Sequence, residues 1–148
     1  MILYLDTSAF IKLYIDEPGT PAVRQTVKIA ALTCSNLIAY VEMRAALARV
    51  ERMGRIGRAE LAGYRREFER DWKTLHSLIP DEAMAHEAAG FAERFGLRGY
   101  DSLHLASAFR IHTQFNNPVT FACFDRALNA AAQEMGLTVL AGIYCGER

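Results

Sequence analysis

Cysteine is scarce in this chain of 148 residues, and its few cysteines follow no recognised pattern. The sequence contains Cys34, Cys123 and Cys145, none of them in a CxxC pair. An odd number of widely spaced thiols does not suit a disulfide framework, so we expect reduced cysteines in a cytosolic protein. The four histidines show no compact pairing with these cysteines, which argues against a zinc site.

The chain also has no excess of charge and no long apolar run. Lys and Arg together number 17, and so do Asp and Glu. Without a global positive field, any contact with a nucleic acid must come from a local patch. No apolar segment approaches the roughly 18 residues of a membrane span, and the chain enters Ile2–Leu5 without a basic leader. We therefore expect a soluble, cytoplasmic protein that makes no membrane contact.

Short apolar segments alternate with helical ones along the whole sequence. Hydrophobic residues make up 51% of the chain, enough for one substantial core, so we expect a single domain over residues 1–148. Strands that are apolar on both faces are typical of a parallel sheet covered on two sides. The pattern predicts an α/β fold, a three-layer α/β/α sandwich. The expected strands are Ile2–Leu5, Leu32–Cys34, Ser77–Ile79, Val119–Phe124 and Leu137–Leu140.

Helices are expected between these strands. Leu61, Tyr64, Phe68, Trp72 and Leu75 form an apolar stripe at helical spacing, and this helix should pack on the preceding one as a hairpin over Asn36–Ser77. The other expected helices are Ser8–Tyr14, Thr20–Ala30, one from a cap at Ser35 or Asn36 to about Met53, one opened by Asp81 and ending at Phe95, one from near Asp101 to about His112, and Arg126–Met135.

Four acidic residues stand where such a sheet places ligands. Asp6 ends the first strand, Asp125 follows the strand Val119–Phe124, and Glu42 lies about two turns into the helix after Leu32–Cys34. Asp101 begins a helix that follows another helix. Ligands of open α/β sheets gather at the carboxyl ends of the strands, so the four acids could converge on one edge.

Each acid also has a purely structural explanation. Asp6, Asp101 and Asp125 all precede helices, where an aspartate commonly caps free N–H groups. Glu42 has small apolar neighbours three and four residues away, which predicts a core-facing position. A carboxylate buried there would need a partner, and Arg49 could pair with it.

Convergence of the acids would require a counter-charge. Two like charges 4 Å apart repel by roughly 4 kcal/mol at an effective dielectric of 20. A divalent cation relieves this repulsion, and oxygen ligands without Cys or His favour Mg²⁺ or Mn²⁺. Such an ion can activate a water and stabilise charge on a phosphodiester, so the acids predict phosphodiester hydrolysis.

Four stretches, each centred on one of these acids, resemble the PIN-domain family, specifically VapC-type toxin ribonucleases. They read YLDTSAFIKLYIDEPGT, SNLIAYVEMRAAL, LRGYDSLHLASA and VTFACFDRALNAAAQEMGLTVL, in this order. The resemblance implies a parallel five-stranded sheet and a metal-dependent endoribonuclease that cleaves single-stranded or structured RNA. It also implies a homodimer and a VapB-like antitoxin that lies across the toxin and can push a basic side chain towards the acids.

The resemblance assigns roles to particular residues. The acids that it implies for catalysis and for binding Mg²⁺ or Mn²⁺ are Asp6, Glu42, Asp101 and Asp125. A hydroxyl residue often supports the first acid; Ser8 fits best and Thr7 is the alternative. Some relatives carry a further acid shortly after the fourth, where Arg126 and Asn129 stand here, so a second metal site stays open.

Further residues near the acids have both functional and structural interpretations. Arg98 and Arg126 are candidate phosphate contacts, although arginines on a solvated face are equally common. Tyr100 could stack on a base, but a core position is more usual. His104 lies one turn after Asp101 and could donate a hydrogen bond near the site or move a proton, whereas a packing role is the more common one.

Two other functions remain open at this point. The first is a catalytically weak RNA-binding or partner-binding module on the same fold, in which the acids act as helix caps. The second is a phosphotransfer domain, such as a phosphatase or a receiver domain. It fits less well, because Asp6-Thr7-Ser8 lacks the second aspartate of a DxD motif and no lysine follows a late strand.

Overall fold

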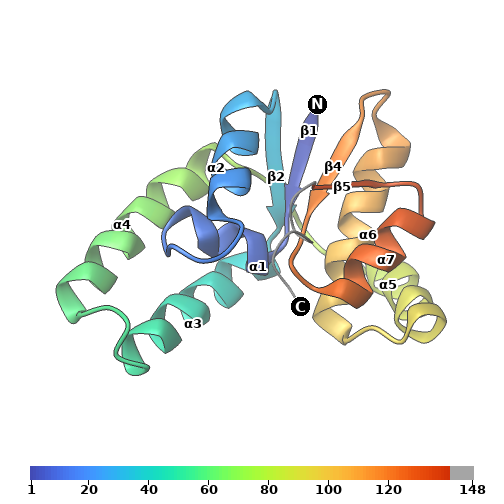
Figure 1. Cartoon of the computed structure of the whole chain (residues 1–148). Helices are drawn as coiled ribbons and strands as arrows, with labels where there is room; N and C mark the ends of the chain where they lie inside the picture. The colour runs from blue at the N-terminus through green and yellow to red at the C-terminus, as the bar shows by residue number, and fades with distance from the viewer. Residues whose placement is uncertain (141–148) are drawn as a thin grey trace.

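Five parallel strands form the centre of the computed structural model, which describes residues 1–140 (Figure 1). The strands are β1 (Ile2–Leu5), β2 (Leu32–Asn36), β3 (His76–Leu78), β4 (Val119–Ala122) and β5 (Thr138–Val139). Their order is β3-β2-β1-β4-β5, and every neighbouring pair is parallel. β1 is therefore central, between β2 and β4. Cys145 lies outside the described residues.

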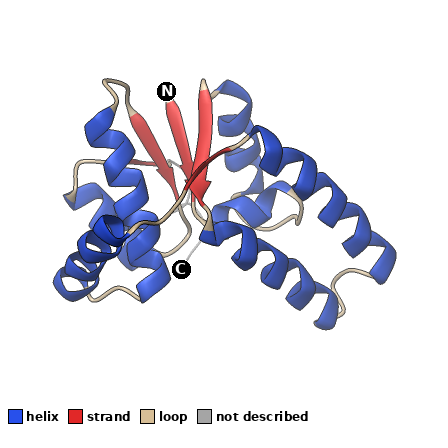
Figure 2. Ribbon diagram, turned by 180° about the vertical axis from the view of Figure 1, so that it is seen from behind, coloured by secondary structure: helices blue, strands red, loops and turns tan. Residues whose placement is uncertain are grey.

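Helices cover both faces of the sheet (Figure 2). One face carries α1 (Thr7–Phe10), the 3-10 turn η1 (Ile11–Leu13), α2 (Thr20–Ile29), α3 (Ile38–Arg52) and α4 (Arg58–Thr74). The other carries α5 (Glu82–Phe95), α6 (Gly99–Gln114) and α7 (Arg126–Glu134). Along β1, Leu3 and Leu5 face the first group of helices, while Ile2 and Tyr4 face the second. This confirms the predicted three-layer sandwich.

The predicted helical hairpin is confirmed as α3 and α4. Phe68 of the apolar stripe is fully buried, and its ring lies 5.4 Å from that of Phe10 and 5.7 Å from that of Trp72, centroid to centroid. Aromatic packing therefore fixes α4 against α1, and α3, which carries Glu42, packs into the same buried cluster through Ala39, Met43 and Leu47.

Several predicted boundaries differ from the structure. Ser35 and Asn36 belong to β2, and α3 begins only at Ile38, because the Ser35 hydroxyl donates to the carbonyl of Leu5 at 2.6 Å instead of capping a helix. Asn36 still accepts a hydrogen bond from the N–H of Ile38, at 2.9 Å. The helix predicted over Ser8–Tyr14 is one α turn followed by η1, and β4 ends two residues earlier than predicted.

None of the helices within residues 1–140 combines the length and the apolar character that crossing a membrane requires.

Candidate active site

Asp6 follows the last residue of β1 and is almost completely buried, with 4% of its surface exposed. Its Oδ1 accepts hydrogen bonds from the Ser8 hydroxyl at 2.7 Å and from the N–H of Ala9 at 3.0 Å, so the predicted capping role is confirmed. Burial raises the pKa of Asp6, by more than His104 and the hydrogen bonds from Ser8 and Ala9 lower it.

Glu42 points from α3 to the same edge of the sheet. Its Oε1 accepts a hydrogen bond from the Thr7 hydroxyl at 2.8 Å and lies 2.7 Å from Nε2 of His104. Burial alone would raise the pKa of Glu42, but these two contacts, together with the charge of Arg98, outweigh it and the pKa is lowered. The ion pair with Arg49 that the sequence allowed is not formed between these described residues, so that alternative was wrong.

Asp101 lies in the first turn of α6 and does not cap it. The helix begins at Gly99, two residues earlier than predicted, and Arg98 occupies the cap position without a side-chain hydrogen bond. The capping interpretation of Asp101 was therefore wrong. Its Oδ2 instead accepts a hydrogen bond from Nε of Arg98 at 2.8 Å.

Asp125 caps α7, as predicted, by accepting a hydrogen bond from the N–H of Leu128 at 2.8 Å. Its other oxygen lies 3.9 Å from a terminal nitrogen of Arg98. Arg98 thus stands between Asp101 and Asp125 and neutralises part of their charge. Arg126, the next residue, is exposed on the first turn of α7.

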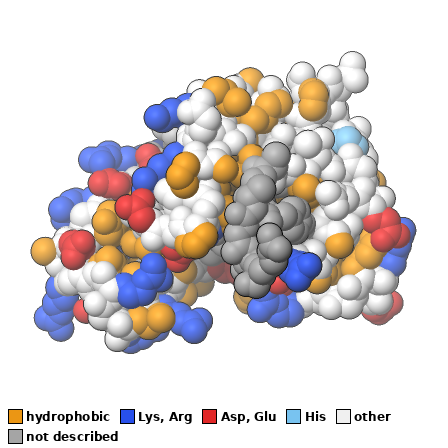
Figure 3. Space-filling model, in the orientation of Figure 1, with side chains coloured by type: hydrophobic (Ala, Val, Ile, Leu, Met, Phe, Trp, Pro, Cys, Tyr) orange, Lys and Arg blue, Asp and Glu red, His pale blue; other side chains and the backbone are white. Residues whose placement is uncertain are grey.

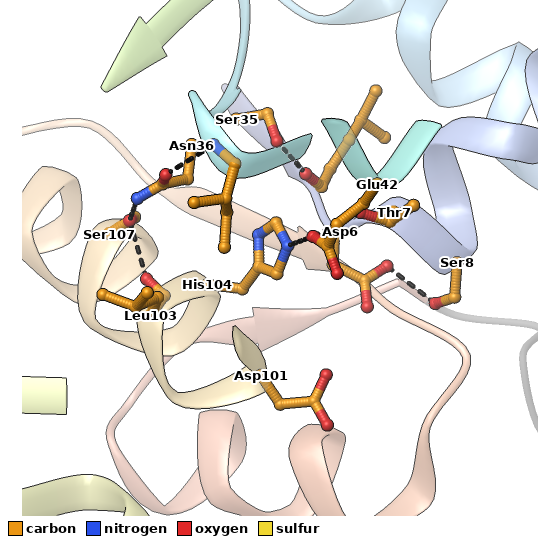
Figure 4. A network of polar contacts seen from close by, with 12 residues as sticks. Asp6, Thr7, Ser8, Ser35, Asn36, Glu42, Asp101, Leu103, His104 and Ser107 are labelled. Atoms are coloured by element: carbon orange, nitrogen blue, oxygen red, sulfur yellow. Dashed lines mark hydrogen bonds and ion pairs between the residues drawn. The ribbon is translucent and has the colours of Figure 1, made fainter. Parts of the chain in front are cut away.

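The acids come from four elements and meet at the carboxyl edge of the sheet. Figure 4 shows the carboxylates of Asp6, Glu42 and Asp101 facing one region, with His104 beside Glu42 and joined to it by a dashed line. A hollow of about 430 Å³ adjoins Glu42 and Asp101, and Arg98, Gly99 and Tyr100 complete its lining. Asp6, Glu42 and Asp101 therefore lie at one edge of the sheet, and Asp125 is connected to this edge through Arg98.

Hydroxyl groups brace the site on two sides. Ser8 donates to Asp6 and accepts a hydrogen bond from the N–H of Phe124 at 2.9 Å, which ties the end of β1 to the residue before Asp125. Thr7 serves Glu42 instead. From the sequence, Ser8 and Thr7 were alternative candidates for the hydroxyl that supports Asp6. In the structure, Ser8 supports Asp6 and Thr7 supports Glu42.

His104 and Tyr4 are the residues whose contacts the sequence did not reveal. A hydrogen bond from His104 near the site was the less favoured interpretation, yet its Nε2 contacts Glu42. Tyr4 was read only as part of an apolar strand, but its hydroxyl lies 2.8 Å from Nδ1 of His104. The helical spacing of Asp101 and His104 indicated that the histidine lies near the acids. No neighbouring residue in the sequence indicated that the Tyr4 hydroxyl would contact a histidine.

The chemistry of the donor set fits a hard divalent cation. Each of the four acids has one oxygen in a hydrogen bond and a second oxygen that accepts none from residues 1–140. The nearby thiol of Cys123 is no competing ligand, because burial raises its pKa far above neutrality. In the described part of the chain, no three Asp, Glu, His or Cys side chains stand close enough to share one ion. Binding of a cation by these acids therefore requires side chains to move. The simplest movement is that of Asp101 away from Arg98.

Comparison with known proteins decides the family. Residues 3–134 match the family model of the PIN domain. This chain belongs to the PIN-domain family. Within it, the chain is of the VapC type: ribonuclease VapC45 of Mycobacterium tuberculosis is 32% identical over 139 residues, which cover 93% of this chain and 94% of that protein. The resemblance of the four acid-centred stretches is thereby confirmed.

Solved structures share the fold of this PIN domain. The crystal structure of PAE2754 from Pyrobaculum aerophilum superposes with a TM-score of 0.67 at 19% identity, over 95% of this chain and 90% of that one. A toxin-antitoxin complex from Klebsiella pneumoniae superposes with a TM-score of 0.59 at 14% identity, over 83% and 86% of the two chains. At these identities the likeness shows a common fold.

Proposed function

We propose that this chain is an endoribonuclease that acts as the toxin of a toxin-antitoxin pair and depends on Mg²⁺ or Mn²⁺. The observation that carries the proposal is that Asp6, Glu42 and Asp101 face one region at the carboxyl edge of the sheet, and that Arg98 links Asp101 to Asp125 there. The kinship with VapC ribonucleases supports RNA as the substrate. The residues that hold the cation are Asp6, Glu42, Asp101 and Asp125.

The chain's own groups prepare the site for hydrolysis. A bound divalent cation would supply water activation and neutralise charge on the phosphate. Hydrogen bonds from Ser8 and Ala9 fix the Asp6 carboxylate at the end of β1, so no energy is spent on ordering it during the reaction. Arg98, once released from Asp101, has a guanidinium suited to the scissile phosphate.

A groove beside the acids suits an RNA strand. It has a volume of about 560 Å³ and runs from Glu42 along α3 to Arg49 and Arg52. Tyr100 lines it and is 62% exposed, so the predicted core position was wrong, and the ring can stack on a base. On the face of the molecule drawn in Figure 3, Lys and Arg side chains stand at several points along the lower edge, the edge towards which the strands run in Figure 1. Such side chains are suited to contact with phosphates.

Protein partners form part of the proposal. We propose a homodimer and a VapB-like antitoxin, as the kinship with VapC suggests. Leu37, Val41 and Ile79 are large apolar side chains with exposures of 42%, 70% and 72%, and Val41 lines the groove next to Glu42. A partner that covered them would remove apolar surface from water and block the acids.

The alternative of a non-catalytic module rests on the capping roles. Asp6 and Asp125 do cap helices, as that alternative requires. Glu42 and Asp101 cap nothing, however, and Glu42 stands on a half-buried face at the cost of desolvating a carboxylate. The enzyme accounts for all four acids, whereas the module accounts for two.

RNA cleavage by matched variants tests the proposal. We expect the wild-type protein to cut labelled single-stranded RNA in Mn²⁺ or Mg²⁺ but not in a chelator, and Asp101→Asn to lose at least 100-fold in kcat while keeping its fold. Glu93→Gln, which removes one negative charge from an exposed position on α5, should cleave normally. A wild-type protein that cleaves equally well in the chelator, or an Asp101→Asn variant as active as Glu93→Gln, would overturn the proposal.

A further inference from the structure

A chain of buried hydrogen bonds runs from the middle of the sheet to Glu42. The Tyr4 hydroxyl lies 2.8 Å from Nδ1 of His104, and Nε2 of His104 lies 2.7 Å from Oε1 of Glu42. Tyr4 is completely buried and His104 is 1% exposed. The three residues come from β1, α6 and α3, so the chain joins three separate elements.

Packing alone does not account for Tyr4 and His104. Tyr4 stacks on Phe121 with ring centroids 5.6 Å apart, within a cluster of buried hydrophobic residues. Phenylalanine and leucine would fill the two positions without desolvating a hydroxyl and an imidazole, which costs free energy unless both are paired. Here each polar group is paired with the other, and the chain ends on a carboxylate of the proposed site.

The positions of the hydrogens in this series of hydrogen bonds follow from the groups at its two ends, the Tyr4 hydroxyl and the Glu42 carboxylate. The Tyr4 hydroxyl carries a proton that it can donate, and Nδ1 of His104 lies within hydrogen-bond distance of it. At the other end, the oxygens of an ionised Glu42 carboxylate can only accept, and Oε1 faces Nε2 of His104. An imidazole that accepts from the Tyr4 hydroxyl at Nδ1 and donates to Glu42 from Nε2–H satisfies both contacts, and this is one of its two neutral tautomers.

We propose that His104 is a positioning residue for Glu42, and that Tyr4 acts through it by selecting the Nε2–H tautomer. The inference rests on the proposed function in one respect, that Glu42 holds a cation. His104 and Thr7 both occupy Oε1, which leaves Oε2 facing the region shared with Asp6 (Figure 4). In the other tautomer, Nε2 would present a lone pair to the carboxylate and push it out of place.

The test begins with the tautomer itself. Nitrogen chemical shifts of the imidazole, measured by NMR on the metal-free protein near pH 7, should show Nε2 protonated and Nδ1 unprotonated in the wild type. In Tyr4→Phe, which keeps the ring and removes only the hydroxyl, we expect a mixture of tautomers. A wild-type spectrum of the Nδ1–H tautomer or of the imidazolium would overturn the proposal.

The second readout is the affinity for Mn²⁺, measured by titration calorimetry without RNA. Tyr4→Phe should bind Mn²⁺ about 10-fold more weakly and lose a similar factor in kcat, with little change in KM for RNA. Tyr14→Phe is the matched control, because Tyr14 is also buried and donates to a carboxylate, that of Asp71 at 2.7 Å, within the hairpin side of the fold. It should leave both values unchanged.

His104 itself can be tested by graded replacement. His104→Gln keeps an N–H that can reach Glu42 and should retain more Mn²⁺ affinity than His104→Leu, which keeps only bulk. Equal Mn²⁺ affinities in these two variants, or a Tyr4→Phe variant indistinguishable from Tyr14→Phe, would overturn the positioning role. The NMR and calorimetric results require no RNA, so a protein that binds Mn²⁺ as expected but cuts no RNA would overturn the proposed function alone.

Discussion

Arg98 and Asp101 form an ion pair at the centre of the site, with Nε of the arginine 2.8 Å from Oδ2 of the aspartate. The same guanidinium lies 3.9 Å from Asp125. Together these carboxylates raise the pKa of Arg98 further, so the arginine stays charged at any pH of interest. The guanidinium of Arg98 therefore neutralises carboxylates that the proposed metal would also neutralise. The arginine and the metal compete for Asp101 and Asp125.

Removing Arg98 should strengthen metal binding. Its side chain is 80% exposed, so the ion pair is screened by water and typical of pairs that contribute about 0.5–1 kcal/mol. Arg98→Gln should therefore bind Mn²⁺ about 2- to 5-fold more tightly by titration calorimetry. Arg94→Gln, which breaks an exposed pair with Glu134 on α7, should have no effect. Weaker or unchanged Mn²⁺ binding by Arg98→Gln would contradict the competition.

Ser8 should matter for stability as well as for activity. Ser8→Ala removes the donor to Asp6 and leaves the N–H of Phe124 without its acceptor, which should cost about 1–2 kcal/mol in the free energy of unfolding. Urea denaturation measures this loss. Ser77→Ala, in β3, removes a hydroxyl with no side-chain hydrogen bond among the described residues and should cost clearly less. Equal losses in the two variants would refute the bracing role of Ser8.

Much of the fold was readable from the sequence, because its signals are local. Apolar strands, the stripe around Phe68 and the caps at Asp6 and Asp125 each depend on a few neighbouring residues. The contact between His104 and Glu42 joins positions 62 apart, and that between Tyr4 and His104 joins positions 100 apart. No local pattern encodes such a pair, so the sequence indicated the acids but not what holds Glu42 in place.

The start of α6 shows a subtler limit. From the sequence, we expect the helix to begin near Asp101, so that Gly99 and Tyr100 precede it and Asp101 caps it. In the structure, both residues belong to the helix, and Asp101 turns to Arg98 instead. Helix ends are set by competing weak contacts, here an ion pair between residues three apart, and this competition is hard to judge from composition.

The pKa of Asp6 predicts an unusual dependence of stability on pH. A carboxyl group whose pKa is raised by folding stabilises the protein at low pH and loses that contribution as the pH rises through the folded-state pKa. Ionised Asp6 therefore costs stability at neutral pH when no cation is bound. In a chelator at pH 7, Asp6→Asn should be more stable than the wild type, and the difference should shrink as the pH falls towards about 4.

Asp81 provides a control for that experiment, because its substitution by Asn should change stability at neutral pH in the opposite direction. Its pKa is lowered, mainly by the hydrogen bond from Arg110, so its contribution is present at neutral pH and is lost as the pH falls through the folded-state pKa. Asp81→Asn should therefore be less stable than the wild type at pH 7. Urea denaturation at several pH values measures both variants, and an Asp6→Asn protein less stable than the wild type at pH 7 would disprove the assignment.

Gly19 should tolerate no side chain. Its φ is +92°, and a Cβ there would lie 2.3 Å from the ring of Phe124, the residue before Asp125. We expect Gly19→Ala to lower the free energy of unfolding by about 2 kcal/mol or more in thermal denaturation and to reduce RNA cleavage. Gly90→Ala is the matched control, because Gly90 lies within α5 with open space around it and should gain up to about 1 kcal/mol. Similar melting temperatures for the two variants would contradict this close packing.

The most direct test of the account is to locate Mn²⁺ by its anomalous X-ray scattering in crystals of the wild-type protein. We predict a peak at the carboxyl edge of the sheet within coordination distance of oxygens of Asp6 and Asp101, with Arg98 turned away from Asp101. The same crystals of Asp101→Asn should show the peak weakened or absent. Saturating Mn²⁺ that leaves this edge empty, or that binds only elsewhere on the protein, would contradict the claim that the four acids form a cation site.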